Sequence, residues 1–187
     1  MNMNEIESDY NEVVRKKYIY IKDIVQQTMA DGPGFRISLY CSGCYHRCKG
    51  CHNPGTWDMF AGKKTDIDDL LEIILKDKWS DVTFTGGDPI YQVDAFTELA
   101  RKIKEQSCKN IWMYTGFLAE DIVNSEKLSQ ILPYIDTIVD GPYIESERDL
   151  SLKFRGSRNQ RVLNVVDGKI IGLLYDENGR AIKKDLN

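Results

Sequence analysis

The sequence predicts an α/β protein with a mostly parallel sheet and a C-terminal β-hairpin. Between residues 66 and 140, short apolar strands alternate with segments of helical period, a pattern typical of βα units. Three strands end in small residues, in the sequences TGGDP, TGF and DGP, and parallel sheets bind ligands at such strand ends. Four cysteines follow an early strand within eleven residues. We therefore expect one small-molecule site where the strand ends meet.

Length and charge limit the classes of protein. The chain has 187 residues, and its 25 Lys and Arg against 29 Asp and Glu give a net charge of −4. This balance argues against nucleic acid as a partner. The sequence contains no apolar run of the ~20 residues that a membrane span needs, and its polar beginning lacks a secretory signal. We expect a flexible lead-in at 1–16, a single domain at 17–187 and a cytoplasmic location.

The elements of the N-terminal half surround the cysteines. Residues 18–25 (YIYIKDIV) and 35–40 (FRISLY) are rich in β-branched and aromatic side chains and predict strands, with a turn at 31–34 between them. Residues 41–64 carry Gly, Pro, Asn and His without periodicity and predict a long loop, which in a compact domain is usually functional. Residues 66–76 have helical spacing, with Asp66 as the cap.

The remaining elements continue the alternation and then change character. The sequence predicts strands at 82–84, 111–114 and 137–139 and helices at 92–105 and 119–132. Residues 161–166 and 169–175 flank Asp167-Gly168, which predicts a hairpin. Asn178-Gly179 predicts a further turn. We expect this last segment to close one edge of the sheet.

The cysteine spacing indicates an iron–sulfur cluster. Cys44, Cys48 and Cys51 are spaced C-x3-C-x2-C, and Cys41 precedes them, whereas a bacterial ferredoxin cluster has a different order of gaps. A zinc site could use all four, but only three residues separate the two pairs, which is a poor fit to zinc modules. Three thiolates suit three irons of a [4Fe–4S] cube. The fourth iron then stays open for a substrate.

These motifs together resemble a known family. The C-x3-C-x2-C run followed by Gly86-Gly87-Asp88-Pro89 is similar to radical S-adenosylmethionine enzymes. The wider context, with DGPGFR at 31–36, HNPGTW at 52–57, DGPY and FRGSRNQR, resembles the activating enzymes of anaerobic (class III) ribonucleotide reductase over residues 18–166. Two positions depart from the pattern. Asp88 stands where many radical S-adenosylmethionine enzymes have Glu, and Gly50 stands where relatives such as formate-lyase activases often carry an aromatic residue.

The resemblance implies two cofactors and a set of contacts. Cys44, Cys48 and Cys51 would hold a [4Fe–4S] cluster whose open iron binds S-adenosylmethionine. The expected contacts to S-adenosylmethionine are Gly86, Gly87 and Asp88 at the methionine amine, Tyr114, Thr115 and Asp140 near adenine and ribose, and Arg158 at the carboxylate. Asp140 has the alternatives of a turn residue or a cation ligand, and Arg158 those of a docking surface or a solvated loop.

The resemblance also implies the reaction and the partners. Electron transfer to the sulfonium would give a 5′-deoxyadenosyl radical, which would take a hydrogen atom from a glycine of the anaerobic ribonucleotide reductase large subunit. A reductant protein such as flavodoxin would supply the electron. Because a complete (β/α)8 barrel needs ~250 residues, we expect an incomplete barrel of the radical S-adenosylmethionine type. Its lateral opening would admit a loop of the reductase.

Other interpretations remain at this stage. The chain could be another short radical S-adenosylmethionine enzyme, either an activase for a different glycyl-radical enzyme or a deazapurine-pathway enzyme, or a zinc-binding interaction module. Cys41 is expected to be a small, half-buried residue at a strand end, and Cys108 an inert connector. We expect His46 and His52 to form hydrogen bonds within the cysteine loop or to pack near the cluster.

Overall fold

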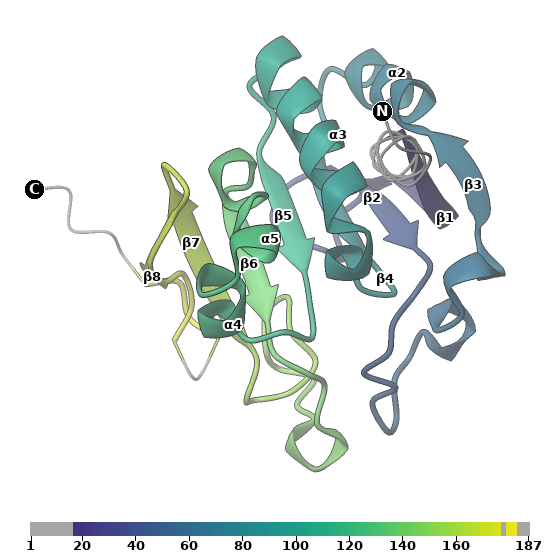
Figure 1. Cartoon of the computed structure of the whole chain (residues 1–187). Coiled ribbons are helices and arrows are strands. Elements are labelled where there is room, and N and C mark those ends of the chain that lie inside the picture. Colours follow the sequence, from purple (N-terminus) through teal and green to yellow (C-terminus); the bar gives the residue numbers. More distant parts are fainter. Residues whose placement is uncertain (1–16, 177–178, 183–187) are drawn as a thin grey trace, which may run out of the picture.

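The computed structural model describes residues 17–176 and 179–182, which form one eight-stranded sheet with helices packed against it (Figure 1). The predicted lead-in, residues 1–16, and Asn178 of the last predicted turn lie outside the described residues. The strands are β1 (Tyr18–Thr28), β2 (Arg36–Cys41), β3 (Lys63–Asp66), β4 (Asp81–Gly86), β5 (Ile111–Tyr114), β6 (Thr137–Asp140), β7 (Arg161–Val166) and β8 (Lys169–Leu173). The α-helices are α2 (Ile67–Lys76), α3 (Val93–Gln106), α4 (Ala119–Val123) and α5 (Glu126–Ser129).

The sheet is mixed, with its parallel part in the centre. Its strand order is β3-β1-β2-β4-β5-β6-β7-β8. The strands β2, β4, β5 and β6 run parallel, whereas β1 and β3 on one side and β7 and β8 on the other are antiparallel to their neighbours. The α/β class is confirmed. The sheet is open, with β3 and β8 as its edge strands.

The C-terminal hairpin is also confirmed. The strands β7 and β8 pair antiparallel, and Asp167 and Gly168 connect them with φ angles of 49° and 72°. Two consecutive positive φ angles are the geometry of the two-residue turn that suits the twist of a hairpin. As expected, β8 closes one edge of the sheet (Figure 1).

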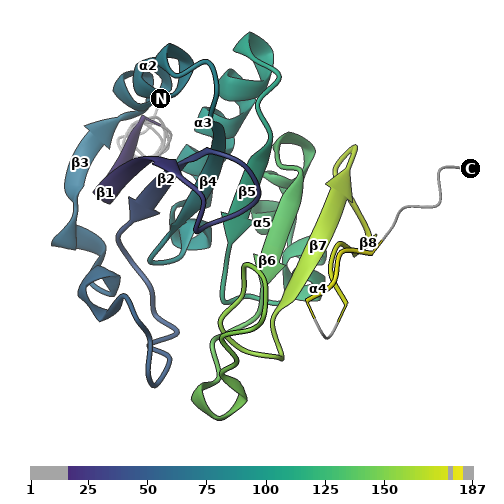
Figure 2. The same cartoon turned by 180° about the vertical axis from the view of Figure 1, so that it is seen from behind.

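The described α-helices, α2 to α5, lie on one face of the sheet. Figure 2, seen from behind, shows the opposite face without helices, crossed by the segment that joins β1 to β2. The buried guanidinium of Arg36 anchors this segment, because it donates to the carbonyl of Pro33 and lies over the ring of Trp112. The hydroxyl of Tyr40 donates to Asp31 in the same segment, with an O–O distance of 2.6 Å. The DGPGFR motif therefore packs against the face of the sheet that lies opposite the helices.

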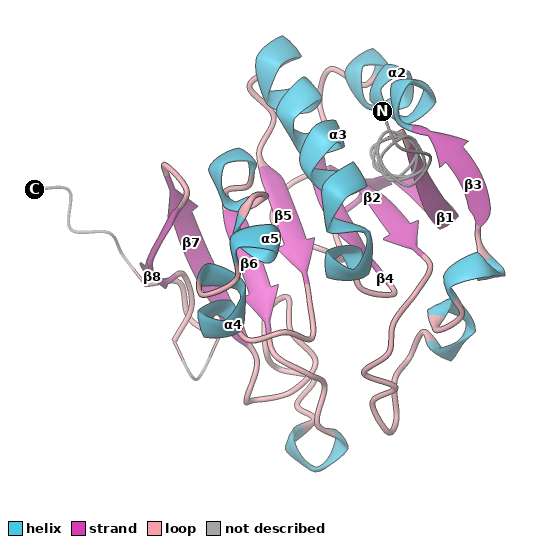
Figure 3. Ribbon diagram, viewed as in Figure 1, coloured by secondary structure: helices cyan, strands magenta, loops and turns pink. Residues whose placement is uncertain are grey.

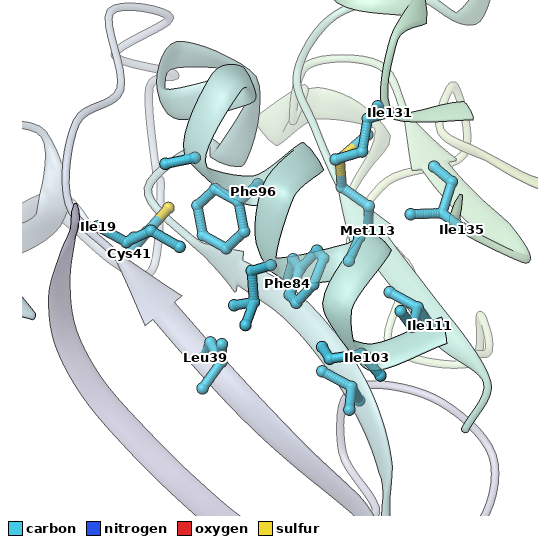
Figure 4. Close-up of a cluster of buried hydrophobic side chains, with 14 of the residues drawn as sticks. Ile19, Leu39, Cys41, Phe84, Phe96, Ile103, Ile111, Met113, Ile131 and Ile135 are labelled. Carbon is cyan, nitrogen blue, oxygen red and sulfur yellow. The ribbon is translucent and has the colours of Figure 1, made fainter. Parts of the chain in front are cut away.

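The main hydrophobic core fills the space between the sheet and the helices (Figure 4). Phe84 of β4 and Phe96 of α3 meet there with ring centroids 4.8 Å apart. The helix α2 buries one apolar face, made of Ile67, Leu70, Leu71 and Ile74. Its predicted cap is present, since Asp66 accepts a hydrogen bond from the amide of Asp68. Cys41 also belongs to this core, on the helix side of β2.

Two segments differ from the sequence prediction. The predicted loop at 41–64 is wrong at its end, because β3 begins at Lys63 and pairs with β1. This strand, KKTD, is a polar edge and so lacks the apolar alternation that identifies buried strands. The single helix predicted at 119–132 is also wrong. It is divided into α4 and α5, because the hydroxyl of Ser125 accepts from the amide of Leu128 and starts a new helix.

The described part of the chain contains no helix with the length and apolarity to cross a membrane. Long loops instead gather at one end of the sheet, beyond the carboxyl ends of the parallel strands (Figure 3). They are the cysteine loop, residues 42–58, and the segment between β6 and β7, residues 141–160.

Candidate functional site

The loops at the carboxyl ends of the parallel strands enclose a cavity of about 160 Å³. It brings together most of the residues that the sequence singled out, which are Cys44, Cys48, Cys51, Gly86, Gly87, Asp88, Tyr114 and Thr115. His46, His52, Asn53 and Gly116 also line it, and the segment between β6 and β7 contributes Tyr143, Gly156 and Gln160. This position follows the rule that open α/β sheets bind ligands outside the carboxyl ends of their strands.

The cysteine loop and the glycine motif are held together by backbone hydrogen bonds. In the parallel pair of β2 and β4, Cys41 lies opposite Gly86. Beyond the strands, the amide of Gly87 donates to the carbonyl of Cys41 at 2.7 Å, and the amide of Asp88 donates to that of Gly43 at 2.8 Å. The pairing of β2 with β4 therefore continues into the two loops and fixes the backbone just before Cys44.

The glycines at this junction are required by close packing. A Cβ atom on Gly87 would lie 2.6 Å from the carbonyl oxygen of Gly43, and one on Gly86 would lie 2.5 Å from the amide nitrogen of Cys41. Gly86 also has a φ of 102°, which side chains other than glycine rarely adopt. The sequence reasoning assigned these glycines to the approach of a ligand. The structure adds a second requirement, the approach of the cysteine loop itself.

The HNPGTW segment folds back along the start of the cysteine loop. The amide of Cys44 donates to the carbonyl of Trp57 at 3.0 Å, and the amide of Gly43 donates to that of Thr56 at 2.7 Å. Thr56 is buried, and its hydroxyl donates to the carbonyl of Asn53. These bonds define both sides of the loop that carries the three cysteines.

The thiols divide into two environments. Cys44, Cys48 and Cys51 are half-buried and line the cavity, whereas Cys41 has no exposed surface and points into the helix-side core (Figure 4). Burial raises the pKa of the Cys41 thiol well above its ordinary value, and it also raises that of Cys44. Cys41 is thus more deeply buried than the half-buried residue that we expected. Cys108 is exposed in the connection between α3 and β5.

The donor set fits a polynuclear cluster. Among the described residues, no group of three His, Cys, Asp or Glu side chains is arranged to hold one metal ion. A [4Fe–4S] cube distributes its cysteine ligands over separate irons, so its thiols need to border one space and need not converge on one point. Cys44, Cys48 and Cys51 border one space in this way. Their chemistry and placement fit a cluster with three protein ligands.

Asp88 joins the cysteine loop to two strand ends. Its carboxylate is 1% exposed; Oδ1 accepts from the amide of Ile90, and Oδ2 accepts from Thr115 Oγ1 at 3.0 Å and from the amide of Gly116 at 2.9 Å. Nε2 of His46 lies 3.1 Å from the same Oδ2. Three of these four contacts converge on Oδ2, so this oxygen joins the cysteine loop to the end of β5.

The strand end of β5 forms the next wall of the cavity. The amide of Thr115 donates to the carbonyl of Val139 at 2.9 Å, which extends the pairing of β5 with β6 by one residue. Burial raises the pKa of the Tyr114 hydroxyl, so this group stays protonated and can donate a hydrogen bond. Thr115 already donates through both its amide and its hydroxyl, the latter to Asp88, so it shapes this wall as a fixed group.

Two residues that the sequence singled out lie elsewhere. Asp140 is completely buried, and its carboxylate accepts from Arg161 Nε at 3.1 Å and from the amide of Ala119 at 2.8 Å. Arg158 is exposed and pairs with Asp149, with an Nη2–Oδ2 distance of 2.9 Å. The structure does not bring either side chain to the cavity lining.

Gln160 lines the cavity and was missed by the sequence reasoning. Its Nε2 donates to the carbonyl of Gly141 at 3.0 Å, and its Oε1 accepts from the amide of Gly156 at 2.9 Å. It lies in the FRGSRNQR motif, where attention went to the arginines. The antiparallel pairing of β6 with β7 explains its position, because Asp140 pairs with Arg161 and so places residue 160 beside the DGP turn.

Comparisons with known proteins agree with this site. Residues 30–163 match the family model of the 4Fe-4S single cluster domain. The anaerobic ribonucleoside-triphosphate reductase-activating protein of Vibrio cholerae serotype O1 is 37% identical over 140 residues, which are 71% of this chain and 89% of that protein.

Two relatives with the same name have similar sequence identity and coverage. That of Enterobacteria phage T4 is 36% identical over 146 residues, covering 74% of this chain and 89% of its own length. That of Escherichia coli K12 is 33% identical over 144 residues, covering 72% and 91%. The cysteine-lined cavity and these relatives together show that the chain is an enzyme of the anaerobic ribonucleoside-triphosphate reductase-activating protein family.

Proposed function

We propose that this protein is a radical S-adenosylmethionine activase that generates a glycyl radical on an anaerobic ribonucleoside-triphosphate reductase. The observation that carries the proposal is the single cavity that three cysteines share with the ends of β4 and β5. The names of the relatives support the reductase as the partner. The match to a 4Fe-4S domain supports the cluster.

The residues of the cavity have separate roles in this proposal. Cys44, Cys48 and Cys51 would hold a [4Fe–4S] cluster through three of its irons, which would leave one iron for S-adenosylmethionine. When bound, these two cofactors supply the electron and the deoxyadenosyl radical that removes a hydrogen atom from the reductase glycine. The carbonyls at Gly86 and Gly87 would accept hydrogen bonds from the methionine amino group. Tyr114 and Thr115 border the adenosyl part.

The open sheet supports an incomplete barrel formed by a single domain. Because β3 and β8 are edge strands and helices cover only one face, the strand ends are not enclosed by a full ring of βα units (Figure 2). We propose that a loop of the reductase enters from this open side. A small reductant protein such as flavodoxin would deliver the electron. Thiols at a cluster site favour a reducing compartment, so we propose the cytoplasm.

Low-temperature electron paramagnetic resonance tests the proposal. The protein is reconstituted anaerobically with iron and sulfide, reduced, and recorded with and without S-adenosylmethionine. We expect a reduced-cluster signal whose shape changes when S-adenosylmethionine is added, and then a glycyl-radical signal when the purified reductase is included. A colourless protein that holds zinc and assembles no cluster would contradict the proposal and favour a structural zinc site.

A further inference from the structure

Two side chains connect the segment between Cys44 and Cys48 to the rest of the molecule. The ring of Tyr45 packs edge to face against that of Tyr91, with centroids 4.9 Å apart, and His46 adds a hydrogen bond. His46 lies between Cys44 and Cys48, and its Nε2 is 3.1 Å from Oδ2 of Asp88. Because a carboxylate only accepts hydrogen bonds, Nε2 carries the hydrogen in this pair. The carboxylate of Asp88 is 1% exposed, so the bond is shielded from competing water on the Asp88 side.

The ring of His46 fits closely into its surroundings. It meets the ring of Phe117 edge to face, with centroids 4.8 Å apart, and lies 5.8 Å from the ring of Tyr91. On its other side is Gly116, where an added Cβ atom would come within 2.5 Å of Cδ2 of the histidine ring. The ring therefore fits in this position only because residue 116 is a glycine and has no side chain.

The partners of His46 come from two neighbouring strands. Asp88 follows β4, and Gly116 and Phe117 follow β5. Asp88 in turn accepts from Thr115 and from the amide of Gly116, so the carboxylate and the ring are fixed by the same strand end. The backbone bonds at Gly43 and Cys44 hold only the start of the cysteine loop. The part between Cys44 and Cys48 is held by the hydrogen bond of His46 and by the ring contact of Tyr45 with Tyr91.

We infer that His46 is a positioning residue that locks the Cys44–Cys48 segment onto the ends of β4 and β5 before any cluster is bound. This inference rests on the proposed function for its purpose, because a preorganised loop presents its thiols to a cluster at a smaller entropic cost. The lock itself uses only groups of this chain.

The test measures amide hydrogen exchange in cluster-free protein. In His46→Leu, we expect the amides of residues 44–48 to exchange roughly tenfold faster, the factor that corresponds to losing a hydrogen bond to a charged group. His46→Gln restores a donor at nearly the position of Nε2, so its exchange should return close to that of the wild type. His52→Leu is the matched control, because His52 is an exposed histidine of the same loop.

A second pair of variants tests the packing of the His46 ring against Gly116, independently of the hydrogen bond. Gly116→Ala places a methyl group against the ring and should accelerate exchange in residues 44–48 in the wild-type background. In the His46→Ala background the ring is absent, so Gly116→Ala should add little. Unchanged exchange in His46→Leu, or an equal effect of Gly116→Ala in both backgrounds, would overturn the inference.

The reconstituted protein separates this inference from the proposed function. If the wild type assembles a cluster, His46→Leu should lose it to an iron chelator several-fold faster than His46→Gln does. If the wild type assembles no cluster, the proposed function fails, whereas the exchange data on cluster-free protein still decide whether His46 locks the loop.

Discussion

Asp140 and Arg161 face each other across β6 and β7, and their side chains form an ion pair whose carboxylate is completely buried. The guanidinium also reaches Glu120 on α4, with an Nη1–Oε1 distance of 2.8 Å. The carboxylate of Asp140 accepts from the amide of Ala119, the first residue of α4. This pair therefore attaches a helix to the sheet, next to the cavity that holds the cysteines.

Removing the guanidinium should destabilise the protein. Arg161→Met leaves the buried carboxylate of Asp140 without its counter-charge, and we expect a loss of roughly 2–3 kcal/mol in the free energy of unfolding. Glu120→Gln removes only an exposed partner and should cost less than about 1 kcal/mol. Urea unfolding of the two variants beside the wild type measures both values. Equal costs would show that the buried pair adds nothing beyond the surface contact.

The pair with Glu120 should also give a pH dependence. The hydrogen bond from Arg161 lowers the pKa of Glu120 from 4.5 to about 2. A carboxyl group whose pKa is lowered on folding stabilises the protein at pH values above the unfolded pKa, and this contribution is lost as the pH falls through the folded pKa. The difference in stability between the wild type and Glu120→Gln should therefore be constant above pH 4.5 and shrink between 4.5 and about 2. Unfolding midpoints measured at several pH values check this, and a difference that grows on acidification would contradict it.

Gly87 should tolerate no side chain. In Gly87→Ala the methyl group meets the carbonyl of Gly43, a backbone atom that moves only with the cysteine loop. We expect a cost of about 1–3 kcal/mol in unfolding free energy and a reduced iron content after reconstitution. Gly55→Ala is the control in the same loop, because an added Cβ atom there meets nothing within 4 Å. If both variants bind iron equally well, the close approach of Gly87 has no role in shaping the site.

Single substitutions should divide the five cysteines into three groups by their effect on activity and stability. Cys44→Ala, Cys48→Ala and Cys51→Ala should each abolish S-adenosylmethionine cleavage, since each removes a proposed iron ligand. Cys41→Ala should keep most of the cleavage and cost about 1 kcal/mol in unfolding free energy, because it removes one buried sulfur from the core. Cys108→Ala should behave like the wild type. Loss of the cluster in the Cys41 variant would contradict the ligand assignment.

The sequence was sufficient for the elements whose side chains repeat with a clear period. The strand at 111–114 has the predicted bounds, and α2 begins after its predicted cap. The sequence was insufficient for elements whose position or length is decided by tertiary contacts. The strand β3 is polar because it lies at an edge, and Ser125 divides a helical pattern because its hydroxyl caps the following turn. Neither fact leaves a mark in the hydrophobic periodicity.

The candidate site shows the same division. Cys44, Gly87 and Thr115 belong to motifs directly after strands, and such positions converge through the parallel topology alone. Asp140 also stands at the carboxyl end of a strand, yet its carboxylate turns toward Arg161, 21 residues later. A carboxylate that faces a ligand and one that faces a buried cation look alike in the sequence. Only the register of β6 against β7 separates them.

The bonds from Gly87 to Cys41 and from Asp88 to Gly43 have a consequence for protein engineering. The cysteine motif and the glycine motif are more than forty residues apart, yet they are two edges of one hydrogen-bonded ladder. A transplant of the cysteine loop alone into another βα protein would arrive without the strand end that sets its starting point. The smallest transferable unit is the parallel strand pair together with both of its loops, and insertions in the intervening α2 should be tolerated far better than a one-residue slip in β2.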